Sequence, residues 1–176
     1  MPRLFTGLEI PAALADELSL FRGGLSGGRW IDPENYHITL RFIGDTDRHM
    51  ARDISLSLAQ IKRAAFTVTL AGLDYFGGDR PHAIVAKAHA ASPLLELQAE
   101  QERLLRRIGL APEPRKFTPH ITLARLRHTP PIAVADYLGN RGFLSRRFDA
   151  ARFVLFSSRD SVGGGPYQIE AAYPLM

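Results

Sequence analysis

Apolar and polar residues alternate most regularly in two stretches of this chain, one in each half. Residues 30–43 form the first stretch, and residues 116–126 form the second. Successive side chains of a strand point to opposite faces, so strict alternation predicts a strand with one face against a core. In the first stretch the apolar face would hold Tyr36, Ile38, Leu40 and Phe42, and the other face His37, Thr39 and Arg41.

The remaining chain divides into helices and shorter strands. Apolar residues spaced three and four apart predict helices at 12–21, from about 46 to 61, at 92–108 and at 133–138, with Asp45 or Thr46 capping the second. Short apolar runs predict strands at 4–10, 66–73, 82–90, 152–157 and 167–173. The run Gly163-Gly164-Gly165-Pro166 predicts a loop before the last strand.

The order of these predicted elements repeats. Each half reads helix, alternating strand, helix, strand, strand, with the N-terminal strand left over. We interpret this order as an internal duplication, in which each half forms one lobe. The expected fold is α+β, with two pseudo-symmetric lobes, each an antiparallel sheet with helices on its outer side, and a cleft between them. No linker separates the halves, so we expect residues 1–176 to form a single two-lobed domain.

Composition narrows the possible chemistry. The chain has no cysteine, which excludes disulfides, thiolate catalysis and cysteine-based zinc sites. Its net charge of +4 would suit a polyanionic partner, but arginine and alanine are abundant enough to indicate a coding bias, so charge adds little. No apolar run is long enough for a membrane span or a signal peptide, and we expect a cytoplasmic protein with no membrane partner.

The two alternating stretches contain the same tetrapeptide, His-Ile-Thr-Leu, at 37–40 and at 120–123. Each copy puts an imidazole and a hydroxyl on one face of its strand, so His37, Thr39, His120 and Thr122 could meet in one cleft. A neutral histidine can accept a proton from water while a protonated one donates to a leaving oxygen, because the pKa of histidine is about 6.5. The hydroxyls could hold a phosphate between them.

Neither tetrapeptide is accompanied by a cluster of carboxylates, so we expect neither a metal nor another cofactor. The other four histidines, His49, His82, His89 and His128, lack a comparable partner in the sequence, and we do not assign them to the site.

The paired tetrapeptides resemble the H-x-T-x repeats of the two-histidine phosphoesterase superfamily. Within it, the chain is similar to the bacterial and archaeal RNA 2′,3′-cyclic phosphodiesterases, historically called 2′–5′ RNA ligases. The likeness includes Arg29-Trp30 and the residues around both tetrapeptides, 35–44 and 117–125. The resemblance implies a metal-independent hydrolase that opens a 2′,3′-cyclic phosphate at an RNA end to a 2′-phosphomonoester. It implies His37 as proton donor and His120 as proton acceptor, with Thr39 and Thr122 on the phosphate; the residues alone do not distinguish donor from acceptor.

The resemblance also suggests two substrate-binding residues. Arg125 matches an arginine that helps to bind substrate in the family, but strict alternation places it on the face opposite His120. It would need a strand end or a bulge to reach the cleft. Phe42 could stack on a base, although its place in the apolar face of Tyr36 favours packing in the core.

The sequence is compatible with several functions. The substrate could be an RNA 3′ end, a small cyclic nucleotide or an ADP-ribose cyclic phosphate, and reversible 2′–5′ ligation is a possible second activity. An RNA-end-binding protein with little turnover would fit the basic charge, but it would not need paired imidazoles. A histidine metal site is disfavoured because typical ligand spacings are absent. A two-lobed monomer would suffice for the proposed site.

Overall fold

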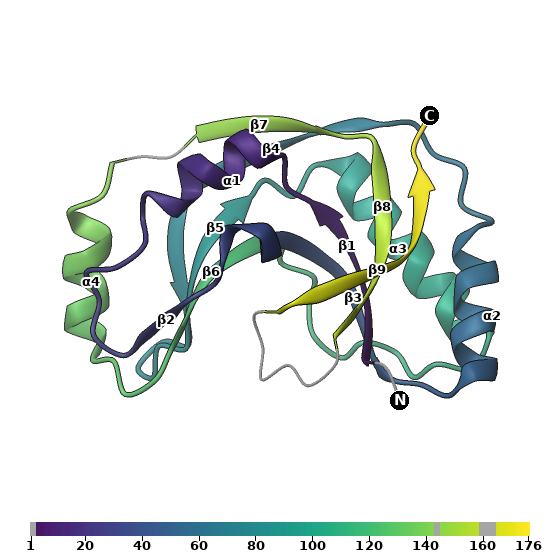
Figure 1. Cartoon of the computed structure of the whole chain (residues 1–176), viewed down its shortest axis with the longest axis horizontal. Coiled ribbons are helices and arrows are strands. Elements are labelled where there is room, and N and C mark those ends of the chain that lie inside the picture. The colour runs from purple at the N-terminus through teal and green to yellow at the C-terminus, as the bar shows by residue number, and fades with distance from the viewer. Residues whose placement is uncertain (1–2, 143–144, 159–164) are drawn as a thin grey trace.

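The computed structural model describes residues 3–142, 145–158 and 165–176, which form four α-helices and a nine-stranded antiparallel sheet. Helix α4 lies at one end of the molecule and helices α2 and α3 lie at the other (Figure 1). In chain order the elements are β1 Arg3–Glu9, α1 Ala12–Ser19, β2 Gly28–Trp30, the 3-10 turn η1 Pro33–Asn35, β3 His37–Asp45, α2 Arg48–Leu58, β4 Phe66–Phe76, β5 Ala83–Ala88, α3 Ser92–Arg107, β6 His120–Leu126, α4 Pro131–Gly139, β7 Ser145–Ala150, β8 Arg152–Ser158 and β9 Tyr167–Pro174.

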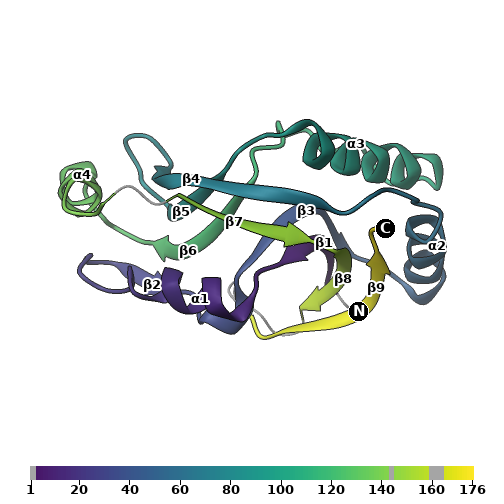
Figure 2. The same ribbon diagram turned by 90° about the horizontal axis from the view of Figure 1, so that it is seen from above.

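The sheet consists of two parts that meet at the motif strands. Its strand order is β7-β4-β5-β6-β3-β1-β8-β9, with β2 paired to β6. Strands β3 and β6 are joined through one residue pair, Ile38 with Ile121. The α+β class and the antiparallel pairing are therefore confirmed, and the two expected sheets are joined into one. Figure 2 shows the same arrangement from above.

The two parts of the sheet do not correspond to the two halves of the sequence. Strands β4 and β5, from the first half, extend the sheet beside the second motif strand, β6. Strand β8, from the second half, pairs with β1, which in turn pairs with the first motif strand, β3. The expectation that each half forms its own lobe was wrong, because β4 and β5 of the first half lie on the side of β6, and β8 and β9 of the second half lie on the side of β3.

The predicted helices are present, with small differences at their ends. Helix α1 ends at Ser19 rather than 21. The N-cap of α2 is Asp47, not Asp45 or Thr46, and its side chain accepts a hydrogen bond of 2.8 Å from the backbone N–H of Met50. Strands β2 and β7 were not predicted, and the motif strands begin at His37 and His120 rather than at residues 30 and 116. Part of the predicted loop 163–166 lies outside the described residues.

A β-bulge interrupts each motif strand at the same position. In β3, Thr39 and Arg41 pair with adjacent residues of β1, so Leu40 is the extra residue. In β6, Thr122 and Ala124 pair with adjacent residues of β5, so Leu123 is the extra residue. A bulge reverses the facing of the side chains that follow it. The alternation predicted beyond Leu40 was therefore wrong.

Within the described ranges, no helix is both long enough and apolar enough to cross a membrane.

Candidate active site

The two tetrapeptides meet at the junction of the two parts of the sheet. Ile38 and Ile121 pair across this junction, and both side chains are fully buried. Their neighbours on either side point to the opposite face. The structure accordingly brings His37, Thr39, His120 and Thr122 together as part of the lining of one cleft of about 990 Å³. Because the strands are antiparallel, His37 lies level with Thr122, and Thr39 lies level with His120.

Hydrogen bonds fix the orientation of the His37 ring. Its Nδ1 lies 2.9 Å from the backbone oxygen of Asn35, and its Nε2 lies 2.8 Å from the hydroxyl oxygen of Thr39. A carbonyl oxygen only accepts, so Nδ1 carries a proton and donates it. In the neutral ring Nε2 is then an acceptor, and the Thr39 hydroxyl donates to it.

Aromatic rings surround His37. The ring centroids of Phe5, Phe156 and Tyr167 lie 5.0, 5.7 and 5.1 Å from the centroid of its imidazole. Burial among these rings is the main reason why the pKa of His37 falls from 6.5 to about 4. The Asn35 carbonyl opposes this shift, while the charges of His120 and Arg125 add to it. His37 is therefore neutral at pH 7 in the absence of substrate.

His120 is held in the same way but in more open surroundings. Its Nδ1 lies 2.7 Å from the backbone oxygen of Thr118, which leaves Nε2 as the acceptor of the neutral ring. The ring of Phe76 contacts it in a T-shaped arrangement, with centroids 4.7 Å apart. Burial lowers the pKa of His120, and Arg125 and His82 lower it further against the opposing effect of the Thr118 carbonyl.

The bulges bring Phe42 and Arg125 into the cleft. Each is the fifth residue after the histidine of its strand, and both line the cleft. Arg125 thus lies on the same face as His120, because the bulge at Leu123 reverses the alternation between them. A bulge of this kind was one of the two ways in which Arg125 was expected to reach the cleft. The prediction that Phe42 packs in the core was wrong, because the bulge at Leu40 turns its side chain outward and leaves it 42% exposed.

Several cleft residues were missed in the sequence. His82 was not assigned to the site, yet it lies in the lining and is close enough to His120 to affect its pKa. Its position follows from the pairing of β5 with β6, which the sequence pattern does not reveal. Further lining residues that no motif had indicated are Arg3, Phe76, Arg115, Lys116 and Tyr167.

Positive charge dominates the described lining of the cleft. It contains four cationic residues, Arg3, Arg115, Lys116 and Arg125, and one carboxylate, Glu113. Such a cleft favours an anionic ligand. Among the described residues, no group of three or more histidine, aspartate or glutamate side chains is arranged to hold a metal ion.

Two curated proteins are similar in sequence to this chain. A protein of Aeropyrum pernix named RNA 2′,3′-cyclic phosphodiesterase is 40% identical over 99 residues, which cover 55% of this chain and 56% of that protein. A protein of the same name from Geobacillus stearothermophilus is 28% identical over 180 residues, which cover 98% of this chain and 57% of that protein. The matched regions thus span little more than half the length of these relatives.

Two solved structures share the fold. Escherichia coli LigT complexed with 3′-AMP superimposes with a TM-score of 0.80 at 23% identity, covering 99% of both chains. A protein of Thermus thermophilus superimposes with a TM-score of 0.81 at 24% identity, covering 98% of this chain and 97% of that one.

The family is shown by a match that occurs twice. The sequence model described as LigT like phosphoesterase matches residues 8–86 and again residues 84–167. Each match contains one copy of His-Ile-Thr-Leu, and together they cover most of the chain. The chain belongs to the LigT-like phosphoesterase family.

Proposed function

We propose that this protein hydrolyses 2′,3′-cyclic phosphates at RNA 3′ ends to 2′-phosphomonoesters, without a metal ion or other cofactor. The observation that carries the proposal is the convergence of two equivalent histidine–threonine pairs on one cationic cleft. The name that the curated relatives share supports this substrate class.

In the proposed reaction the cyclic phosphate lies between the two imidazoles. His120 Nε2 accepts a proton from water, whose oxygen attacks phosphorus. The bond between phosphorus and O3′ breaks, and His37 Nε2 donates its proton to O3′, so the phosphate remains on O2′. The hydroxyls of Thr39 and Thr122 donate to the non-bridging oxygens and stabilise the negative charge that develops there.

The different surroundings of the histidines support this division of roles. His120 has the more open position, which gives it access to water. His37 lies among aromatic rings, and its low pKa makes its protonated form a strong acid toward the departing oxygen. The bound phosphate anion would raise the pKa of His37 and so favour protonation before the reaction.

Arg125 and Phe42 have supporting roles in this proposal. Arg125 affects the pKa of both imidazoles, which places its charge near the reacting phosphate. Phe42 presents an exposed ring to the cleft and would stack on a base.

A hydrolysis assay with product identification tests the function. The protein is incubated with a dinucleotide that ends in a 2′,3′-cyclic phosphate, with 2′,3′-cyclic AMP and with an ADP-ribose cyclic phosphate, each with and without EDTA. Phosphorus NMR should identify a 2′-phosphomonoester, formed at the same rate in EDTA. Tight binding of the dinucleotide without turnover would instead support an RNA-end-binding protein, and activity that EDTA abolishes and a divalent ion restores would contradict the metal-independent mechanism.

A further inference from the structure

The segment that joins α3 to β6 forms one wall of the cleft although it contains neither helix nor strand. Residues 108–119 connect the two elements, and four consecutive members, 115–118, line the cleft. A segment of this kind holds its side chains in place only when its backbone is tied to the rest of the fold.

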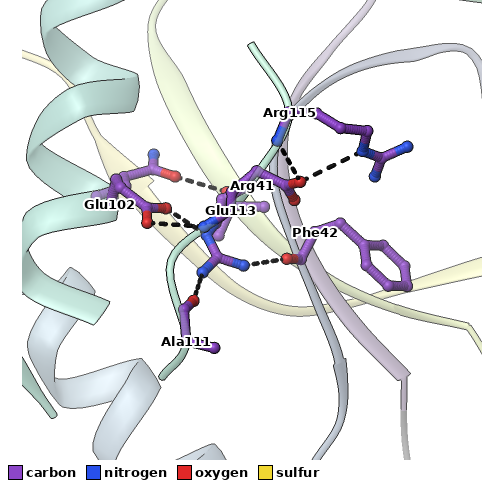
Figure 3. A network of polar contacts seen from close by, with 8 residues as sticks. Arg41, Phe42, Glu102, Ala111, Glu113 and Arg115 are labelled. Carbon is purple, nitrogen blue, oxygen red and sulfur yellow. Dashed lines mark hydrogen bonds and ion pairs between the residues drawn. The ribbon is translucent and has the colours of Figure 1, made fainter. Parts of the chain in front are cut away.

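The buried side chain of Arg41 ties this backbone to the rest of the fold through hydrogen bonds (Figure 3). The Arg41 side chain is 6% exposed, and its Nε donates to Glu102 Oε2 at 2.5 Å. Its Nη2 donates to the backbone oxygen of Ala111 at 2.5 Å, and its Nη1 donates to the backbone oxygen of Phe42. One guanidinium therefore connects the motif strand β3, the helix α3 and the start of the segment.

The partner carboxylate continues the network toward the cleft. The second oxygen of Glu102, Oε1, accepts from the backbone N–H of Glu113 at 3.1 Å. Glu113 Oε1 in turn accepts from the backbone N–H and the Nε of Arg115, at 3.2 and 3.3 Å. Partial burial would raise the pKa of Glu113, but the hydrogen bonds from Arg115 outweigh it and the net shift is downward. Arg41 and Glu102 thus fix the backbone that carries Arg115.

Arg115 and Lys116 lie in the cleft but not at its reacting centre. Both are exposed, with 80% of the Arg115 side chain accessible. The charges that shift the pKa of His37 and His120 include Arg125 but neither of these two residues. In Figure 3 the Arg115 and Phe42 side chains extend to the same side, away from Glu102. An exposed aromatic ring beside cationic groups suits a base and its phosphate.

We propose that Arg115 and Lys116 bind the phosphodiester between the last two nucleotides of the RNA, and that the Arg41–Glu102 pair positions them to do so. This inference rests on the proposed function and names its substrate class as an oligonucleotide rather than a cyclic mononucleotide. The cyclic phosphate carries one negative charge and has Arg125 and the two histidines beside it. The additional cations match a second phosphate, which a cyclic mononucleotide lacks. The cleft volume of about 990 Å³ is at the upper end of the roughly 300–1,000 Å³ typical of small-ligand sites.

The test compares two substrates that differ only in this second phosphate and the nucleoside attached to it, a dinucleotide 2′,3′-cyclic phosphate and the corresponding cyclic mononucleotide. In Arg115→Ala/Lys116→Ala, kcat/KM for the dinucleotide should fall by about tenfold or more, mainly through KM, and should fall much less for the mononucleotide. The slope of log KM against log salt for the dinucleotide should decrease by about 0.7, the value for the one phosphate contact that is lost. The control Arg52→Ala/Lys62→Ala removes the same charge from exposed positions outside the lining and should change neither value.

Glu102→Gln tests the positioning role. This variant keeps the side-chain volume but weakens the tie, so it should raise KM for the dinucleotide and leave kcat within a few fold. An equal loss on both substrates in Arg115→Ala/Lys116→Ala, or no loss, would overturn the inference while leaving the proposed function in place. If the unmodified protein cleaves neither substrate, the proposed function fails and the inference fails with it.

Discussion

Strands β3 and β6 carry the same tetrapeptide and the same bulge, but their histidines lie in different surroundings. His37 is enclosed by the rings of Phe5, Phe156 and Tyr167, whereas His120 contacts the ring of Phe76 and lies in more open surroundings. The repeated tetrapeptide thus supplies two equivalent imidazoles, and the residues around them make the pair unequal. The proposed mechanism uses this inequality by giving one imidazole the role of acid and the other the role of base.

The positions after the bulge show the same divergence. The fourth residue after the histidine is buried in both strands, and it is Arg41 in β3 but Ala124 in β6. The fifth residue lines the cleft in both strands, and it is Phe42 in β3 but Arg125 in β6. Both strands have the same backbone geometry at these positions, but their side chains differ. In β3, Phe42 gives the cleft an aromatic surface and Arg41 forms buried hydrogen bonds. In β6, Arg125 gives the cleft a positive charge.

Removing either histidine should have the largest effect. His37→Ala and His120→Ala should each lower kcat by about 10²–10⁴-fold, because each removes one proton transfer. The measurement is the rate of hydrolysis of a dinucleotide 2′,3′-cyclic phosphate, with circular dichroism to verify folding. His49→Ala, on α2 and outside the cleft lining, is the matched control. Near-normal turnover in either cleft variant would contradict the mechanism.

The buried Arg41 of β3 should contribute strongly to the free energy of unfolding. Arg41→Met should lower the free energy of unfolding by about 3–5 kcal/mol, because it leaves the carboxylate of Glu102 partly buried without its charged partner. Urea denaturation measures this loss. Arg41→Met combined with Glu102→Leu should recover part of it, since no unpaired charge remains. A loss below about 1 kcal/mol in the single variant would show that the tie contributes little.

The pKa of His37 makes stability depend on pH. The unfolded histidine titrates near 6.5 and the folded one near 4, so between these values the unfolded state binds more protons. Stability should therefore be complete above pH 6.5 and decrease as pH falls toward 4, by about 3 kcal/mol in total. Denaturation across this range should show a weaker pH dependence in His37→Asn. An unchanged dependence in that variant would exclude His37 as its source.

The two residues at the fifth position should differ in their response to salt. Phe42→Ala should weaken substrate binding by about 1–3 kcal/mol through lost stacking, with no change in salt dependence. Arg125→Ala should weaken binding and also reduce the slope of log KM against log salt by about 0.7, the value for one phosphate contact. Equal salt slopes in both variants would contradict the assignment of stacking to one wall and charge to the other.

Local patterns predicted most of the secondary structure and the central residues of the site. Helical spacing identified α2 and α3, and the repeated His-Ile-Thr-Leu identified the four residues that meet at the cleft. The exchange of strands between the halves was not predicted, since pairing between distant segments leaves no local pattern. Strand β7 was missed because its sequence, Ser-Arg-Arg-Phe-Asp-Ala, has little apolar signal.

The bulges explain the remaining differences. Alternation assumes that every residue pairs in turn, and the one extra residue at Leu40 was enough to misplace Arg41 and Phe42. The same feature resolved the position of Arg125, which alternation alone had placed on the wrong face. The cations of the segment 108–119 were not predicted either, because their approach to the cleft depends on the buried contacts of Arg41.

The central claim is that His37 and His120 act together on one phosphate, and a double-mutant cycle tests it most directly. The rates of hydrolysis of one dinucleotide 2′,3′-cyclic phosphate are measured for the unmodified protein, His37→Ala, His120→Ala and the double variant. Groups that act as a unit are strongly non-additive. The double variant should therefore be less than about tenfold slower than the slower single variant. Losses that multiply fully in the double variant would contradict the claim.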